Sequence, residues 1–153
     1  MKRTVIDDLI DNFKKLDIGE VANQSITNAT LNDAVDLNIE QLNDSELNNS
    51  EQVGNYAKAT ESYNDYRSTK VSSSERIKFY DTGQFHRSIK ASINKKGDLK
   101  FNSNSRKLPR LTAYLEDKGY TGGLLGLNEE KLASFLDFFK QDVVNGINKK
   151  LLK

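Results

Sequence analysis

His86 is the only histidine in the chain, and the chain has no cysteine. Zinc sites are built from several histidine, cysteine or carboxylate ligands, so this composition argues against a conventional one. General acid–base catalysis by His86 would need a carboxylate to orient the ring, and Asp81 is the acidic residue nearest in sequence. No nucleophile motif accompanies the two residues. We therefore predict that His86 is an ordinary, partly exposed side chain.

Asp81, Thr82 and Gly83 form an Asp-Thr-Gly sequence that resembles the catalytic tripeptide of aspartic proteases. In those enzymes two copies of the tripeptide meet, and their two carboxylates share one proton. A homodimer could supply both copies, so a small hydrolase with an Asp81 active site is one reading of the chain. The basic flank at His86 and Arg87 disfavours it. We predict a structural turn instead, because Asp81 or Thr82 can cap a helical turn and Gly83 admits unusual backbone angles.

Two other patterns lack the spacing that their chemistry requires. Residues 119–123 have the glycines of a phosphate loop, but no Gly-Lys-Ser/Thr sequence follows them. The aspartates near the N-terminus, which are Asp7, Asp8, Asp11 and Asp17, do not follow the alternate spacing of a calcium loop. We expect a flexible hinge or turn at the glycines and a solvated helix face at the aspartates. The chain is therefore predicted to be no enzyme and to bind no cofactor and no metal ion.

A basic cluster is the one binding candidate. Its seven members lie within 21 positions, and Asp98 is the only acidic residue among them. They are Lys90, Lys95, Lys96, Lys100, Arg106, Lys107 and Arg110. Seven cations suffice for salt-sensitive contact with phosphates, although only Phe101 interleaves as an aromatic and no nucleic-acid motif is present. We expect the cluster to face either an acidic protein surface or passing DNA, without sequence-specific recognition.

The net charge of +1 conceals two opposed blocks. Residues 1–66 hold 13 acidic and 5 basic side chains, whereas residues 67–110 hold 12 basic and 3 acidic ones. Such blocks can be solvated faces that neutralise each other within one monomer. Alternatively, the acidic block of one subunit faces the basic block of the next, or the basic block faces nucleic acid. The low apolar content of 36% also indicates surface that is irregular, exposed or buried only in a complex.

Hydrophobic periodicity predicts the helices that would position these residues. Apolar residues at helical spacing favour helices over residues 5–16, 31–42 and 129–151. Gly19 is predicted to stop the first, Thr30 to cap the second and Asn128 to cap the third. Two phenylalanines of the third helix, Phe135 and Phe139, are predicted core residues.

Alternating polar and apolar residues predict a β-hairpin that includes residues 89–93 and 99–101, with its turn at 94–98. A short strand over 77–80 is also predicted, and residues 43–75 are expected to form an irregular loop. Pro109 is expected at the first position of a helix that Gly119 ends. Together these elements predict one α+β domain over residues 1–153, with a small antiparallel sheet around a central hairpin that N- and C-terminal helices pack.

The sequence gives no sign of membrane insertion or export. No run approaches the roughly 18 apolar residues of a membrane span, and the N-terminus lacks the apolar segment of a signal peptide. The lack of cysteine leaves no disulfide to form. We therefore expect synthesis in a cytoplasm and no membrane partner.

With its elements in this order, the chain resembles the head–tail connector, or tail-completion, proteins of tailed bacteriophages. In that family a Thr-Gly-x-aromatic/Leu-x-x-Ser-Ile element enters a β-strand, and a Glu-x-Gly-like segment and a closing helix follow. The stretch from Thr82 to Ile89 matches the first element, and the stretch from Leu115 to Gly119 loosely matches the second. The likeness covers about residues 35–152. One departure is that residues 120–126 replace the proline-rich segment that usually precedes the closing helix.

The resemblance implies a structural virion protein without catalysis, made in the host cytoplasm. Such a neck-ring subunit would form a homo-oligomeric ring and assemble with the portal and with other neck or tail proteins. An alternative from a different class is a non-specific DNA-binding or regulatory phage protein that uses the basic hairpin. A gene beside portal and capsid genes would favour the first, and tight DNA binding by an isolated monomer would favour the second.

Overall fold

The computed structural model describes residues 5–94 and 96–152. In these residues the fold is α+β, as predicted, with one two-stranded antiparallel sheet and helices on both sides of it in sequence. The elements are α1 (Val5–Lys14), α2 (Ile18–Ser25), α3 (Asn28–Asn43), α4 (Lys58–Ser62), the 3-10 helix η1 (Asn64–Tyr66), α5 (Gln84–Ser88), β1 (Ile89–Ile93), β2 (Leu99–Ser103), α6 (Leu108–Asp117) and α7 (Glu129–Leu151).

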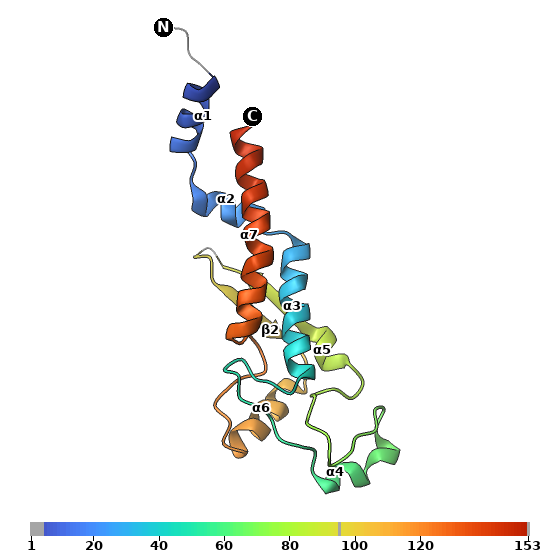
Figure 1. Cartoon of the computed structure of the whole chain (residues 1–153). Coiled ribbons are helices and arrows are strands. Elements are labelled where there is room, and N and C mark those ends of the chain that lie inside the picture. Colours follow the sequence, from blue (N-terminus) through green and yellow to red (C-terminus); the bar gives the residue numbers. More distant parts are fainter. Residues whose placement is uncertain (1–4, 95, 153) are drawn as a thin grey trace.

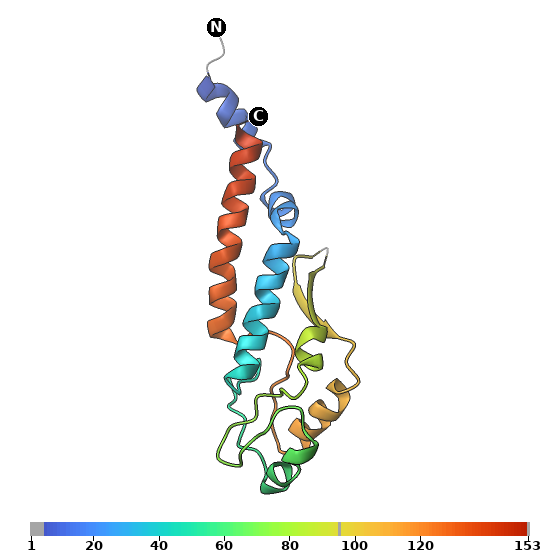
Figure 2. The same ribbon diagram turned by 90° about the vertical axis from the view of Figure 1, so that its right-hand side faces the viewer.

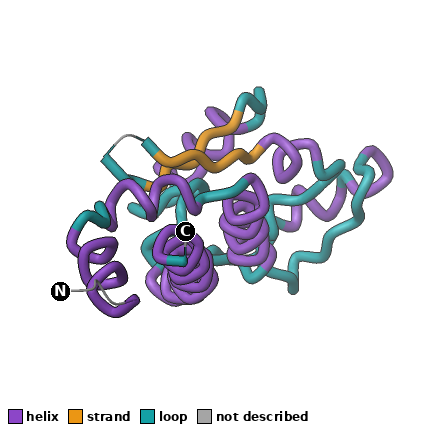
Figure 3. The backbone as a smooth tube through the Cα atoms, turned by 90° about the horizontal axis from the view of Figure 1, so that it is seen from above, coloured by secondary structure: helices purple, strands orange, loops and turns teal. Residues whose placement is uncertain are grey.

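The molecule is elongated, and its elements form layers around α3. Helix α3 contacts both α7 and β1, so it lies between α7 and the hairpin (Figure 2). Viewed from above, the strands lie on one side of these helices (Figure 3). Helix α1 and the end of α7 project together at one end of the molecule, and α4 and α6 lie at the other (Figure 1). None of the helices in the described part of the chain is both long and apolar enough to cross a membrane.

Local capping explains where the N-terminal helices begin. Asp17 accepts a hydrogen bond from the Glu20 N–H at 3.0 Å and starts α2, a helix that the sequence did not predict. Gly19 therefore lies inside a helix, and the prediction that it ends helical structure was wrong. Helix α3 starts at Thr27, which forms a reciprocal capping box with Thr30. Thr30, the predicted cap, lies within the helix.

The hairpin has the predicted alternation. Ile89, Ala91 and Ile93 pair with Ser103, Phe101 and Leu99, and this face packs toward α3 and the core. The opposite face pairs Lys90 with Asn102 and Ser92 with Lys100, and these four side chains are exposed. The short strand predicted over residues 77–80 does not form. Instead, the Ile77 N–H donates to the Gly54 carbonyl at 3.0 Å, next to an isolated bridge between Asn55 and Arg76.

The core gathers side chains from α3, α5, β1, α6 and three irregular segments. Its buried members are Leu42, Leu47, Val53, Phe79, Phe85, Ile89, Leu115 and Leu124. Phe85 and Ile89 are both buried, because they stand four residues apart where α5 enters β1. Leu47 and Val53 belong to the predicted irregular loop, which is largely irregular but supplies core residues. Burying each such side chain contributes about 1.5–3 kcal/mol.

The glycine-rich segment before α7 is held by hydrogen bonds to α3 and to the segment that follows α3. The Asn48 N–H donates to the Gly123 carbonyl at 3.0 Å, and the Gly123 N–H donates to Asn48 Oδ1 at 2.8 Å. Asn38 Nδ2 donates to the carbonyls of Leu124 and Gly126, each at 3.1 Å. These contacts do not fit the flexible hinge that the glycines predicted. Asn128 then caps α7, as predicted, by accepting the Lys131 N–H at 2.9 Å.

Candidate functional site

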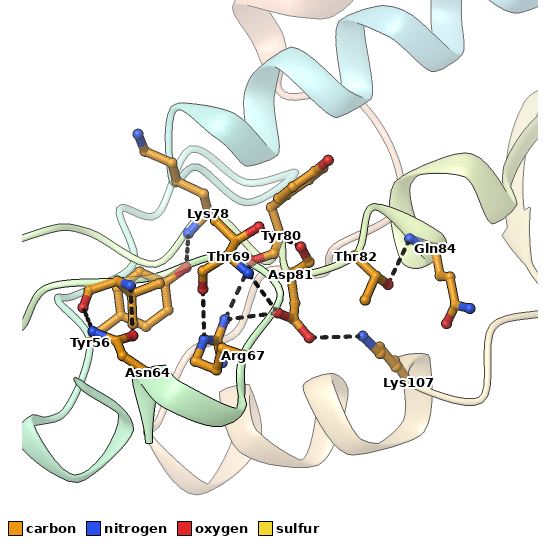
Figure 4. A network of polar contacts seen from close by, with 11 residues as sticks. Tyr56, Asn64, Arg67, Thr69, Lys78, Tyr80, Asp81, Thr82, Gln84 and Lys107 are labelled. Carbon is orange, nitrogen blue, oxygen red and sulfur yellow. Dashed lines mark hydrogen bonds and ion pairs between the residues drawn. The ribbon is translucent and has the colours of Figure 1, made fainter. Parts of the chain in front are cut away.

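Asp81 joins three segments of the chain (Figure 4). Its carboxylate lies 3.8 Å from Arg67 Nη2 and 3.7 Å from Lys107 Nζ. Lys107 is the residue immediately before α6. Thr69 Oγ1 donates to the Asp81 carbonyl at 2.5 Å, and the Thr69 N–H donates to Asp81 Oδ1 at 3.4 Å. The residue therefore ties the segment around 67–69 and the start of α6 to the turn at 81–83.

Gly83 shows why this turn needs a glycine. Its φ of 76° lies in the left-handed region, where it precedes the first turn of α5. A Cβ atom there would lie 2.6 Å from Arg87 Nη1 and 3.1 Å from the Tyr80 ring. Arg87 Nη2 in turn donates to the Thr82 carbonyl at 3.2 Å, and Thr82 Oγ1 accepts the Gln84 N–H at 3.4 Å. The turn is thus stabilised locally on both sides.

A pocket of about 310 Å³ lies beside Asp81, with Tyr56, Phe79, Leu111 and Tyr114 among its walls. The Arg67 guanidinium stands 5.9 Å from the Tyr56 ring centroid, and it approaches Asp81 as well. A shared-proton pair would require a second carboxylate to approach a carboxylate that two cations already hold. This arrangement argues against a hydrolase centred on Asp81. Among the described residues, no three His, Cys, Asp or Glu side chains gather in a way that could hold a metal ion.

His86 is buried, with 5% of its surface exposed, so the prediction of a partly exposed histidine was wrong. The Tyr80 ring meets it edge-on with centroids 5.4 Å apart, and Phe85 lies on another side. Burial lowers the pKa of His86, although a hydrogen bond with the Lys78 backbone opposes this. Its Nε2 atom has no hydrogen-bond partner among the described residues. The side chain is part of the packing beneath the turn.

The structure divides the predicted basic cluster. Lys90 and Lys100 are exposed on the outer face of the hairpin, and Lys96 is exposed at its turn. Lys95 lies outside the described residues. Arg106 and Arg110 are exposed at the start of α6, away from the hairpin turn, whereas Lys107 is turned to Asp81. The cluster is thus a cationic hairpin face, which we define as Lys90, Lys96 and Lys100, and a separate pair beside α6.

An acidic stripe follows the exposed side of α3. Its members are spaced three or four residues apart, and they are Asp33, Asp36, Glu40 and Asp44. Lys131 of α7 reaches two of them, with Nζ 3.0 Å from Glu40 and 3.9 Å from Asp44. Burial of Lys131 by itself lowers the pKa of its ammonium group. The hydrogen bond and the charge of Glu40 outweigh this effect, and the pKa of Lys131 is raised. The stripe and the cationic hairpin face are on separate layers of the molecule.

The apolar stripe of α1 is exposed, which its sequence pattern did not indicate. Ile6 and Phe13 expose 67% and 60% of their surfaces, and Leu9 and Ile10 are also exposed. On α7, Phe135 is buried as predicted and Phe139 is half-buried against it, with the ring centroids 6.2 Å apart. Leu132, Leu136, Phe138 and Val144 of the same helix are exposed. Exposed apolar helix faces of this extent are typical of interaction surfaces.

Comparison of the chain with family models, curated proteins and solved structures found no match.

Proposed function

We propose that this protein is a structural, non-catalytic subunit of a tailed-bacteriophage virion, in a ring at the head–tail junction that assembles with portal and tail proteins. The sequence resemblance supports this proposal, and so does the order of the elements. The stretch from Thr82 to Ile89 forms the short helix α5 that leads directly into β1. The stretch from Leu115 to Gly119 ends α6, and α7 is the closing helix.

The observation that carries the proposal is the amount of exposed surface. The chain exposes 10448 Å², whereas a compact monomer of its mass exposes roughly 7,800 Å². The excess is about a third, and α1 and α7 both expose apolar side chains. A standard protein interface buries about 800 Å² on each partner. The excess is therefore sufficient for two such interfaces, and each subunit of a ring has two neighbours.

The distribution of charge supports contacts between unlike surfaces. The cationic hairpin face and the acidic stripe of α3 are different surfaces of one chain, with α3 between the hairpin and α7 (Figure 2). Contact between them in neighbouring copies would be heterologous, and a heterologous contact that closes makes a ring. Such complementary charges mainly select the partner and its orientation, while the apolar area supplies affinity.

One observation favours a second candidate function, non-specific DNA binding. Lys90 and Lys100 lie on the same outer face of the hairpin, on neighbouring diagonal positions of the two strands. Cations that share a flat, exposed face can contact neighbouring phosphates of a nucleic acid. A monomer with this function would bind duplex DNA, and each lost phosphate contact would reduce its salt dependence.

Negative-stain electron microscopy of the purified protein, alone and mixed with the portal protein of the same phage, tests the proposal. Closed rings that co-purify with the portal are the expected result. Dispersed monomers in both samples would contradict it. Salt-sensitive DNA binding by those monomers would then favour the second candidate.

A further inference from the structure

An apolar groove of about 540 Å³ lies between α2, the hairpin tip and the first half of α7. Four side chains of α7 form one wall, and they are Leu132, Phe135, Leu136 and Phe139. Ile93 and Leu99 of the hairpin form part of the other wall. Leu132 and Leu136 remain exposed along this groove, so the chain itself does not fill it.

Helix α1 carries an exposed apolar stripe of its own. The stripe consists of Ile6, Leu9, Ile10 and Phe13, all exposed. Helix α1 does contact α7. However, its less exposed residues are Asp11 and Asn12, which do not belong to the stripe. The contact with α7 thus leaves much of the apolar face of α1 exposed, above all at Ile6 and Phe13.

The two stripes share one spacing. Ile6, Leu9, Ile10 and Phe13 stand at positions i, i+3, i+4 and i+7, and Leu132, Phe135, Leu136 and Phe139 repeat this pattern. At about 1.5 Å per residue, each stripe runs for about 10.5 Å along its helix. Helices with apolar stripes of equal length and spacing can pack side by side, ridges into grooves.

Helix α1 of the same chain lies away from the groove. Within one chain, α1 lies beside the end of α7 (Figure 1), whereas the groove lies along its first half. Only residues 15–17 join α1 to α2, and α2 itself forms one side of the groove. In the folded chain, α1 therefore does not occupy the groove.

We propose that α1 of each subunit docks in the groove of the next subunit, with its stripe of Ile6, Leu9, Ile10 and Phe13 against the α7 wall. This inference rests on the self-assembly in the proposed function and names the surfaces that perform it. The two surfaces differ, so the contact is heterologous and passes from copy to copy until the ring closes. Subunits with one surface disabled should still use the other.

Paired variants test this contact. Ile10→Glu disables the helix and Leu136→Glu disables the groove, and each should weaken association roughly 30-fold or more, as loss of an interface hot spot does. Each variant alone should be monomeric in light scattering. Their mixture should stop at dimers, because one variant keeps the helix and the other keeps the groove. Val144→Glu, also on exposed α7 but outside the groove lining, is the matched control and should still form the wild-type multimer.

The absence of cysteine permits a direct second measurement. Mild oxidation of Ile10→Cys/Leu136→Cys should give a ladder of covalent multimers on a non-reducing gel, whereas Ile10→Cys/Val144→Cys should stay largely monomeric. An internal disulfide, or covalent dimers from Ile10→Cys alone, would overturn the proposal in favour of docking within one chain or pairing between two α1 helices. If wild type and both Glu variants form rings equally well, this contact is overturned but the proposed function is not. A wild-type chain that stays monomeric, even with the portal protein, would overturn both.

Discussion

Glu51 and Gly122 are 71 positions apart in sequence, and the Gly122 N–H donates a hydrogen bond of 2.7 Å to Glu51 Oε2. The same carboxylate accepts the Thr121 N–H at 2.8 Å. Hydrogen bonds from the Asn49 side chain, Gly122 and Thr121 lower the pKa of Glu51 to about 2. The carboxylate thereby fastens the segment that leads to α7 onto the segment that follows α3. This attachment holds the segment that precedes the closing helix.

Replacement of Glu51 by glutamine should reduce stability in a pH-dependent way. The folded-state pKa of Glu51 is about 2, below its ordinary value of 4.5, so its stabilising effect is complete above pH 4.5 and disappears as the pH falls toward 2. In urea unfolding at neutral pH, the free energy of unfolding should be larger for wild type than for Glu51→Gln. This difference should shrink to zero as the pH falls from 4.5 to 2. A difference that is the same at every pH would contradict this role.

Gly122 should not tolerate a side chain. A Cβ atom there would overlap the Asn49 side chain and lie 2.8 Å from Cβ of the buried Leu47. We expect Gly122→Ala to lower the free energy of unfolding by about 1–3 kcal/mol, because the packed segment must shift. Gly54→Ala is the matched control, since its nearest neighbour would be 3.5 Å away. It should be neutral or slightly stabilising. Equal effects of the two substitutions in denaturant melts would refute the close packing.

The only histidine should give the protein a second pH dependence. Burial lowers the pKa of His86 below its ordinary value of 6.5, so the folded state resists protonation. The stabilising contribution of the neutral His86 is therefore complete above pH 6.5. It falls below pH 6.5, because the unfolded chain then gains a proton that the folded chain does not. His86→Phe retains a ring against Tyr80 and removes the titrating group. Its melting temperature should therefore fall less than that of wild type between pH 7.5 and 5.5, and parallel curves would argue against a buried, neutral His86.

The parts of the fold that the sequence predicts well are those with local signals. Helix α7 has a long apolar period and a capping side chain at Asn128, and the hairpin strands alternate over residues 89–93 and 99–101. Helix α2 was missed because Gly19 was read as a stop, although Asp17 starts a new helix two residues earlier. Phe135 was predictable as a buried residue, since it lies in the middle of the apolar period.

Other features depend on contacts between distant residues and leave no local signal. The glycines before α7 read as a hinge because Asn38 and Asn48, which hold their backbone, come more than 70 positions earlier. The outer face of the hairpin was predictable from alternation, whereas the ion pair of Lys107 with Asp81 was not. The exposure of α1 could not be foreseen, because an apolar stripe has the same sequence pattern whether the same chain or another copy covers it.

Reversal of charge on the hairpin distinguishes a protein neighbour from DNA. Lys90→Glu/Lys100→Glu should leave the monomer folded, because exposed charges contribute little to stability. If the cationic hairpin face meets an acidic neighbour, the variant should fail to form multimers, and we expect this result. If it lines a passage for DNA, multimers should persist while DNA affinity and its salt dependence both fall.

Lys118→Glu/Lys140→Glu makes the same change of charge just after α6 and on α7, and it serves as the control. Multimer size comes from light scattering and DNA affinity from titrations at two salt concentrations. An unchanged result in both measurements would show that the hairpin face takes part in neither contact.

Self-assembly is tested most directly by the solution mass of the unmodified protein, measured by multi-angle light scattering over a concentration series with and without the portal protein. The mass should rise from that of the 17.3 kDa chain to a fixed multiple of it and then stay constant, as a closed ring requires. A mass of 17.3 kDa at every concentration, with the portal protein present or absent, would contradict it.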